Sequence, residues 1–211
     1  SMPPAAAHPA GPEPAAAEVE ARLAAAERAF AVWRRTDLPA RAAAMRRAAR
    51  VLRDGCPRFA RLMTEEMGKP IAAAEAEVEK CAVACEFFAE HAARFLADEP
   101  VATDAACSLV RCEPLGPLLA VMPWNFPFWQ VFRAAVPALM AGNVIVLKHA
   151  SNVPGCALAT AEVFAAAGFP EGAFTSLLLP AHAAEGLVDH PVIRAVTLTG
   201  SEAAGRALGA T

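Results

Sequence analysis

The chain is organised around the stretch LLAVMPWNFPFW, residues 118–129. Its opening residues, 118–122, are all apolar, which is typical of a strand buried on both faces of a parallel sheet. Asn125 follows between prolines and aromatic residues, and a helical pattern then continues toward Gly142. Ligands of open α/β sheets bind at the carboxyl ends of such strands, so this amide lies where chemistry is expected. Alternatively, Asn125 only ends the strand or caps the helix, which is the interpretation that its spacing alone favours.

Apolar strands and helices alternate after residue 117. Segments that are apolar throughout predict a parallel sheet with right-handed crossovers. The expected fold class is therefore α/β, with N-terminal helices followed by a doubly wound, Rossmann-like parallel sheet that is incomplete at its C-terminus. The expected strands are 118–122, 144–148, 174–179 and 195–199, and the helices between and after them begin near Phe126, Pro154, His182 and Ser201.

Helical patterns fill most of the chain before residue 101. Residues 1–14 begin with Ser-Met, as after an expression tag, and are rich in proline and alanine, so we expect a disordered tail. The chain then divides into a helical segment (15–100), a β connection (101–117) and the first part of a nucleotide-binding domain (118–211). The expected helices begin near Ala15 and span 36–55, 57–68 and 70–97, with Thr36-Asp37 as the cap of the second and a short β-like run at 107–112.

The composition indicates a soluble globular protein whose partner is a small molecule. The 211 residues are 56% hydrophobic and 19% charged, which suffices for a buried core. No apolar run approaches the ~20 residues that cross a bilayer, and the N-terminus lacks a secretory signal, so a cytoplasmic location is expected. The net charge of -3, without clusters of like charge, predicts no binding of nucleic acid or of an anionic membrane.

The six cysteines form no CxxC pair, and no histidine stands at zinc-ligand spacing from them, so we expect reduced thiols and no metal site. Cys81 and Cys85 fall on an apolar stripe with alternating spacing of three and four residues. This spacing is typical of the buried face of an amphipathic helix, which favours core contacts over a metal half-site. The other members of the stripe are Ile71, Ala74, Val78, Phe88, Ala92 and Phe95, and the remaining cysteines are Cys56, Cys107, Cys112 and Cys156.

The run PWNFPFWQVFRAAVPALMAGNVIVLKHASNVPGCA, residues 123–157, resembles the corresponding segment of the aldehyde dehydrogenase superfamily, in particular its succinate-semialdehyde dehydrogenase-like branch. The resemblance extends from about residue 15 to Thr211, whereas the family's polypeptide is considerably longer. It implies NAD(P)-dependent oxidation of an aldehyde, such as succinate semialdehyde, through a cysteine thiohemiacetal. The family's nucleophilic cysteine and general-base glutamate match no position here. The chain is therefore expected to lack the catalytic domain and to be inactive by itself.

The same resemblance assigns roles to residues around two strand ends. Asn125 matches the asparagine that donates its amide to the oxyanion of the thiohemiacetal. Lys148 matches the family's cofactor lysine, and His149 follows it where many members have proline. Ser151 stands where NAD-preferring members often have a glutamate that repels a 2′-phosphate, so the cofactor is NADP or NAD, with NADP tolerated. The alternatives are a surface lysine at Lys148 and a helix cap at Ser151.

Further site residues lie at the two turns that flank the expected cofactor. Met122, Pro123 and Trp124 end the first strand and are assigned to cofactor binding. The tetrad Leu-Thr-Gly-Ser at 198–201 resembles the family's turn over the pyrophosphate, although Ser201 by itself predicts only a helix cap. The remaining assignments are Gly200 and Ser201 to the cofactor, Phe126 and Trp129 to the substrate or the core, and Arg133 to an acidic substrate or a structural ion pair.

Two other functions remain open at this stage. One is a non-catalytic nucleotide-binding or assembly module, truncated by nature. The other is an acylating relative that passes the acyl group to coenzyme A. We also expect a homo-oligomer or help from a missing segment, because a parallel sheet that stops at Thr211 leaves a strand edge and apolar surface uncovered.

Overall fold

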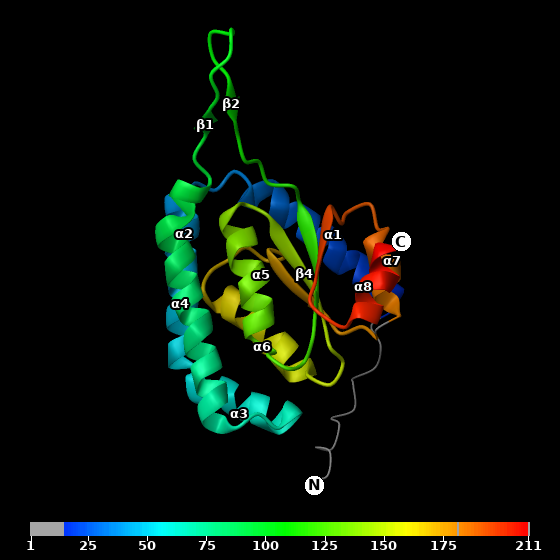
Figure 1. Cartoon of the computed structure of the whole chain (residues 1–211). Helices are drawn as coiled ribbons and strands as arrows, with labels where there is room; N and C mark the ends of the chain where they lie inside the picture. Colours follow the sequence, from blue (N-terminus) through cyan, green and yellow to red (C-terminus); the bar gives the residue numbers. More distant parts are fainter. Residues whose placement is uncertain (1–14, 181, 211) are drawn as a thin grey trace.

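The computed structural model describes residues 15–180 and 182–210, so the tail assigned to residues 1–14 lies outside the described residues. Helices fill the first part of the chain, as the sequence predicts (Figure 1). The Asp37 carboxylate caps the second helix by accepting a 2.8 Å hydrogen bond from the amide of Ala40, and Gly68 ends the third helix with a φ of 72°. These helices are α1 (Ala16–Trp33), α2 (Leu38–Asp54), α3 (Cys56–Met67) and α4 (Ile71–Phe95).

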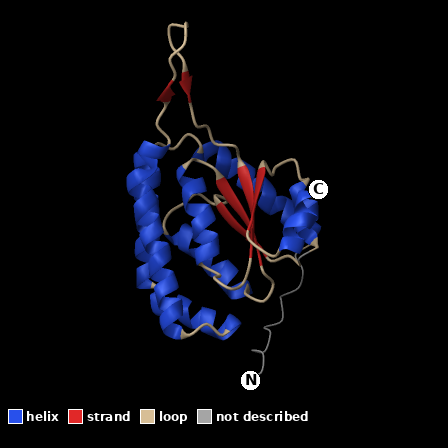
Figure 2. Ribbon diagram, viewed as in Figure 1, coloured by secondary structure: helices blue, strands red, loops and turns tan. Residues whose placement is uncertain are grey.

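A parallel sheet follows, and it confirms the α/β fold class. Its strands run in the order β5-β4-β3-β6, and every pairing between them is parallel (Figure 2). Residues 144–147 of β4 are buried, as expected for a strand covered on both faces. The strands are β3 (Pro117–Met122), β4 (Val144–His149), β5 (Phe174–Leu177) and β6 (Ala195–Leu198), and the helices are α5 (Trp129–Met140), α6 (Pro154–Ala166), α7 (Ala183–Val188) and α8 (Glu202–Gly209).

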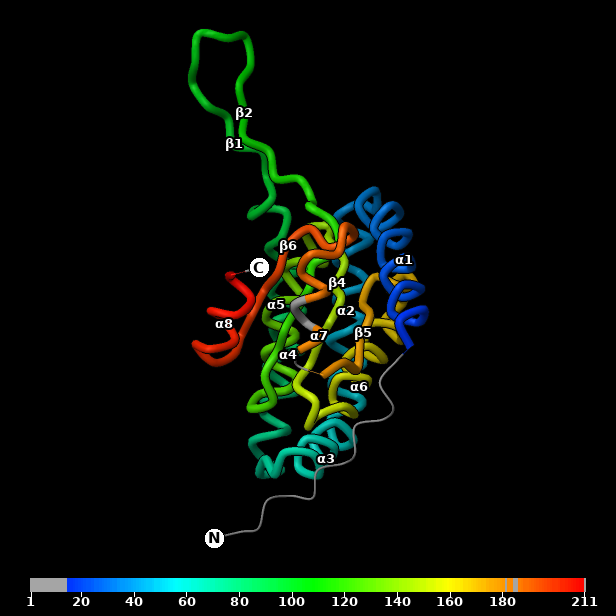
Figure 3. The backbone as a smooth tube through the Cα atoms, turned by 90° about the vertical axis from the view of Figure 1, so that its right-hand side faces the viewer, coloured from blue at the N-terminus to red at the C-terminus, as the bar shows by residue number. Residues whose placement is uncertain are grey.

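The strand order creates a switch point between β3 and β6. The chain first adds β4 and β5 on one side of β3, with α5 and α6 as the connections. It then returns through α7 and adds β6 on the other side of β3. Helices α5 and α6 cover one face of the sheet, while α1 and α7 lie on the other (Figures 1 and 3). In open α/β sheets a ligand crevice forms outside the carboxyl ends of the strands at such a point.

Helices α2, α3 and α4 form a further layer outside α5 and α6. Trp33 donates a 2.9 Å hydrogen bond from Nε1 to the carbonyl of Leu139, and the buried Arg41 donates to the carbonyl of Met140. Both bonds go to carbonyls in the last turn of α5, where the carbonyl of Leu139 also accepts a 3.0 Å hydrogen bond from the amide of Gly142. A single hydrophobic core therefore extends from α1 through the sheet to α6.

Three local expectations are wrong. One is the boundary of the short β-like run at 107–112: the run itself is confirmed as β2, but the strand covers only Leu109–Val110. It pairs antiparallel with β1 (Glu99–Pro100) in an arm that extends from the body (Figure 1). On α4, Cys81 and Cys85 are fully buried as predicted, but Ile71 and Phe95 are 49% and 47% exposed. The helices that cover α4 leave its two ends uncovered, so the stripe is buried only in its middle. Helix α5 begins at Trp129, three residues later than expected.

Within residues 15–180 and 182–210, no helix is both long enough and apolar enough to cross a bilayer.

Candidate functional site

The segment 123–128 is an irregular turn between β3 and α5. Trp124 and Phe126 are 50% and 45% exposed, so the core alternative for Phe126 is wrong. The side chain of Asn125 is exposed, and within the described residues it makes no hydrogen bond. It does not cap α5 either, because the N-cap position is Phe128 and has no side-chain cap. A free amide donor therefore stands at the carboxyl end of β3.

Glu77 of α4, and not Asn125, caps the amino end of α5. Its Oε1 accepts hydrogen bonds of 2.9 Å from the main-chain amides of both Phe128 and Trp129. A carboxylate at a helix N-terminus interacts favourably with the free amides and with the helix dipole. The other oxygen, Oε2, accepts a hydrogen bond from the ammonium group of Lys69, and both side chains are almost fully buried.

Lys69 also reaches the turn directly. Its Nζ donates a 3.1 Å hydrogen bond to the main-chain carbonyl of Asn125 and lies 3.8 Å from the ring centroid of Phe126. Sequence analysis did not identify Lys69 or Glu77. The sequence contains a signal for Glu77, because this residue stands beside Val78 on the apolar face of α4. An unpaired charge would be costly there, so a partner for Glu77 could have been expected.

His149 supports the same turn from the opposite side. Its Nδ1 accepts a 2.8 Å hydrogen bond from the amide of Ala150, so Nε2 carries the proton and donates to the carbonyl of Pro127 at 2.9 Å. Burial lowers the pKa of the imidazole, which favours this neutral form. The imidazole is thus engaged by the protein itself, and His149 does not line the cavity described next, in contrast to its assignment to the cofactor.

A cavity of about 470 Å³ lies at the switch point, over the carboxyl ends of β3, β4 and β6. It brings together Met122, Pro123, Lys148, Ser151 and Gly200 of the expected cofactor residues. Trp124 and Ser201 are not among the residues that line it, and neither is Asn125, two residues beyond Pro123. Asn152 and His182 also line the cavity, although the sequence did not indicate them as site residues, and so does Thr199 of the tetrad at 198–201.

The electrostatics of the cavity suit an anion. Lys148 is only 5% exposed, and burial lowers the pKa of its ammonium group. Within the described part of the chain, Nζ has no hydrogen-bond or ion-pair partner. No aspartate or glutamate occurs among the described lining residues. A bound phosphate would therefore meet a cation and no opposing carboxylate.

Ser151 is exposed and does not cap α6, so the cap interpretation of this residue is wrong. The N-cap position of α6 is Val153, and the helix takes its acceptor from α3 instead. Glu66 accepts hydrogen bonds of 2.6 Å from the amide of Gly155 and 2.9 Å from the amide of Cys156. Ser151 is left free to contact whatever enters the cavity.

The turn after β6 closes the other side of the cavity. Ser201 caps α8 through a 3.2 Å hydrogen bond from the amide of Ala204 to its Oγ, as its position before a helix predicts. Arg133 donates from Nη2 to the hydroxyl of Thr199 at 3.0 Å. No ion pair of Arg133 occurs among the described residues, so its contact ties α5 to this turn and the ion-pair alternative is not observed.

The cysteines form no disulfide. Some of them lie away from this edge of the sheet, and the others have thiols of low reactivity. Burial raises the pKa of the thiols of Cys81, Cys85 and Cys156, which disfavours the nucleophilic thiolate. Cys107 and Cys112 are exposed, in and beside the arm formed by β1 and β2.

Comparisons with known proteins agree with this geometry. A model of the aldehyde dehydrogenase family matches residues 8–211. The "Probable succinate-semialdehyde dehydrogenase" for NADP(+) of Synechocystis sp. is 56% identical over 188 residues, which are 89% of this chain and 41% of that protein. "Succinate-semialdehyde dehydrogenase 1" for NADP(+) of Mycobacterium tuberculosis is 50% identical over 196 residues, which are 92% of this chain and 43% of that protein.

Solved structures share the fold. The succinic semialdehyde dehydrogenase of Streptococcus pyogenes, crystallised with NADP+, has a TM-score of 0.90 and 32% identity, covering 94% of this chain and 44% of its own. The succinate-semialdehyde dehydrogenase of Burkholderia pseudomallei has a TM-score of 0.89 and 36% identity. The chain spans less than half the length of the curated relatives quoted above. The resemblance stated from residues 123–157 is confirmed.

Proposed function

Since this chain belongs to the aldehyde dehydrogenase family, we propose that it forms the cofactor-binding part of an NAD(P)-dependent aldehyde dehydrogenase and supplies its oxyanion donor. The substrate proposed is a semialdehyde such as succinate semialdehyde, by similarity to the relatives named above. The observation that carries the proposal is the amide of Asn125 at the end of β3, next to a cavity that holds Lys148. Neither side chain has a polar partner in the part of the chain that the structure describes.

The cavity fits a nicotinamide dinucleotide in position and charge. It occupies the switch point between β3 and β6, and the amino end of α8 with Gly200 borders it. The buried ammonium group of Lys148 would bind a phosphate or ribose hydroxyls of NAD(P). A bound nicotinamide would accept the hydride from the aldehyde carbon.

NADP is the proposed cofactor, and this choice rests on Ser151 and the absence of carboxylates among the described lining residues. A 2′-phosphate beside Ser151 would meet a hydroxyl donor and Lys148 rather than a repelling glutamate. The relatives from Synechocystis sp. and Mycobacterium tuberculosis carry NADP(+) in their names, which agrees with this choice.

In the proposed mechanism Asn125 holds the oxygen of the thiohemiacetal. An amide donor is neutral and fixed by the turn, so it stabilises negative charge that develops on the oxygen without competing for the proton. We also propose that none of the six cysteines in this chain is the nucleophile. Cys81, Cys85 and Cys156 are buried, and burial also raises the pKa of the Cys56 thiol on α3. Cys107 and Cys112 lie by the arm. The thiolate and the base would then come from a part of the enzyme outside this sequence.

Association of the enzyme into homo-oligomers is part of the proposal. The arm of β1 and β2 extends from the body, and Val101, Leu109 and Val110 on it are between 43% and 56% exposed. Apolar side chains on an extended arm gain stability when a second copy covers them.

The test of the proposed function has two steps. First, binding of NADP and of NAD to this chain is measured by titration, with Lys148→Met as the variant that should lose affinity. Second, the complete polypeptide that carries this sequence is assayed for reduction of NADP with succinate semialdehyde and, separately, with acetaldehyde. Binding with turnover supports the enzyme, and dependence on coenzyme A would indicate acyl transfer. Binding without turnover in the complete polypeptide would contradict the proposal in favour of a non-catalytic module.

A further inference from the structure

Two buried charges meet the turn that carries Asn125, and neither belongs to the cavity. Lys69 lies between α3 and α4, and Glu77 lies in the second turn of α4, so both come from the helical layer. The exposed fractions of the two residues are 7% and 4%. Burying two charges is costly unless each is paired and hydrogen-bonded, so the contacts that this pair makes require an explanation.

The contacts of the pair converge on the turn. Glu77 accepts from the amides of Phe128 and Trp129, and Lys69 donates to the carbonyl of Asn125 itself. The main chain is therefore tied on both sides of Pro127, from residue 125 to residue 129. Each of these bonds has one charged partner, which makes it shorter and stronger than a bond between neutral groups.

The side chain of Asn125 has no partner of its own among the described residues, so the protein places it only through the backbone, which sets the direction of the Cα–Cβ bond and the rotamers available to the amide. An oxyanion donor acts only when it is aimed at the position the oxygen will occupy. We propose that Lys69 and Glu77 form a charged clamp that positions the amide of Asn125, making both of them positioning residues for the reaction. This inference rests on the proposed function, because it assigns to Asn125 the role of oxyanion donor.

The first test is kinetic and uses the complete polypeptide. Glu77→Gln keeps the size of the side chain but removes the charge that holds Lys69. A misplacement of about 1 Å costs roughly 100-fold in rate, so we expect kcat to fall by roughly 10-fold to 100-fold. The KM for the aldehyde and the Kd for NADP should stay within about twofold, because the clamp does not line the cavity.

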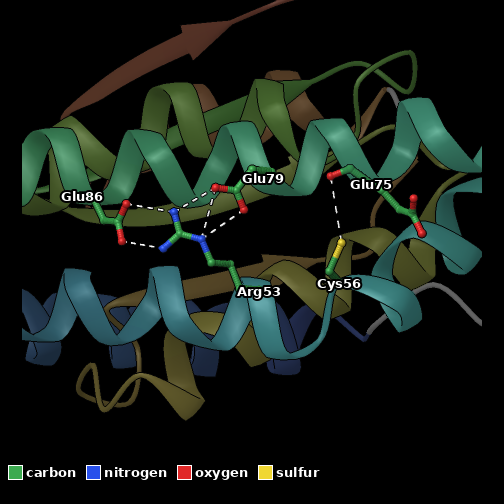
Figure 4. A network of polar contacts seen from close by, with 5 residues as sticks. All are labelled: Arg53, Cys56, Glu75, Glu79 and Glu86. Atoms are coloured by element: carbon green, nitrogen blue, oxygen red, sulfur yellow. Dashed lines mark hydrogen bonds and ion pairs between the residues drawn. The ribbon is translucent and has the colours of Figure 1, made fainter.

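The matched control is Glu79→Gln, the same change two residues further along α4. Glu79 forms an exposed network with Arg53 and Glu86 that links α4 to α2 and does not touch the turn (Figure 4). Exposed ion pairs contribute little, so kcat of this control should stay within about twofold of the parent enzyme.

A double-mutant cycle separates positioning from general stability. If Glu77 acts through Asn125, then Glu77→Gln should change kcat by less than about twofold once Asn125→Ala is present. A loss of the same factor with and without the Asn125 amide would overturn the proposal, and so would an unchanged kcat in Glu77→Gln alone. Should Glu77→Gln not fold, Lys69→Met takes its place, because it removes the contact with Asn125 and leaves the two amide bonds of Glu77 in place.

Hydrogen exchange tests the clamp without any reference to activity. In this chain, Glu77→Gln should speed exchange of the amides of Phe128 and Trp129 by roughly 10-fold or more, whereas Glu79→Gln should not. Unchanged exchange would refute the clamp even in an active enzyme. Faster exchange in a polypeptide without turnover would refute the proposed function and the positioning role, while the structural clamp would stand.

Discussion

The carboxylate of Glu66 on α3 accepts a 2.6 Å hydrogen bond from the amide of Gly155 at the amino end of α6. A Cβ atom at residue 155 would come within 2.8 Å of Glu66 Oε1, so a larger residue there would displace this carboxylate from its present position. Glu77 accepts in the same way at the amino end of α5. The helical layer therefore supplies a carboxylate to each of the two helices that cover one face of the sheet. The layer thereby fixes the edge of the sheet where the candidate site lies.

Replacing Glu66 should therefore destabilise the fold. Glu66→Ala leaves the amides of Gly155 and Cys156 without their acceptor, and we expect the free energy of unfolding to fall by about 1–3 kcal/mol. Urea denaturation measures the change, and Glu65→Ala, at an exposed position of the same helix, is the control. Equal stability of the two variants would show that water replaces the cap at no cost.

Replacing Asn125 should affect catalysis and leave the fold intact. Asn125→Ala in the complete polypeptide should lower kcat by about 100-fold to 1,000-fold, the loss measured for other oxyanion donors. Its free energy of unfolding should change by less than about 0.5 kcal/mol, because the amide has no partner in the described structure. Asn125→Asp, with an acceptor in place of the donor, should lose at least as much. Full activity of Asn125→Ala would remove Asn125 from the mechanism.

A carboxylate at residue 151 should change cofactor preference. Ser151→Glu places a negative charge in a cavity whose described lining has none, so it should repel a 2′-phosphate and raise the Kd for NADP by about 10-fold or more. The Kd for NAD should change much less. Ser151→Gln has the same shape without the charge and separates repulsion from steric hindrance. If both variants weaken NADP equally, the charge is not the cause.

His149 should make the free energy of unfolding depend on pH. Burial lowers the folded-state pKa of this imidazole below the ordinary value of 6.5. Below pH 6.5 the unfolded chain therefore binds the proton more readily than the folded chain, and stability falls as the pH drops. The slope from this one group is at most about 1.4 kcal/mol per pH unit.

His149→Gln should lack that contribution, while its amide can still donate to the carbonyl of Pro127. Unfolding by urea at pH 7.5 and at pH 5.5 gives the comparison. The parent protein should lose more stability between the two pH values than the variant does. Parallel losses in the two proteins would mean that His149 is already protonated in the fold or that other groups dominate.

Much of the architecture follows from local pattern. The apolar runs predict the bounds of β3 and β4 to within one residue. This works because consecutive residues of a strand are apolar when both faces of the strand are covered. Asp37 and Gly68 mark helix ends through local properties. The side chain of Asp37 caps the amino end of its helix, and the backbone of Gly68 adopts the positive φ that ends another. The motif around Asn125 is specific enough to indicate the family, which the comparisons confirm.

The order of the elements, the fold class and the family thus follow from the sequence alone. Which groups serve the candidate site depends on the packing of elements that are distant in the sequence. Glu77 and Phe128 are 51 positions apart, and Glu66 and Gly155 are 89 apart, so no local pattern pairs them. The same holds for His149, whose imidazole faces the carbonyl of Pro127 instead of the cavity. A helix end binds whichever acceptor the neighbouring layer brings to it, and that depends on how whole helices pack together.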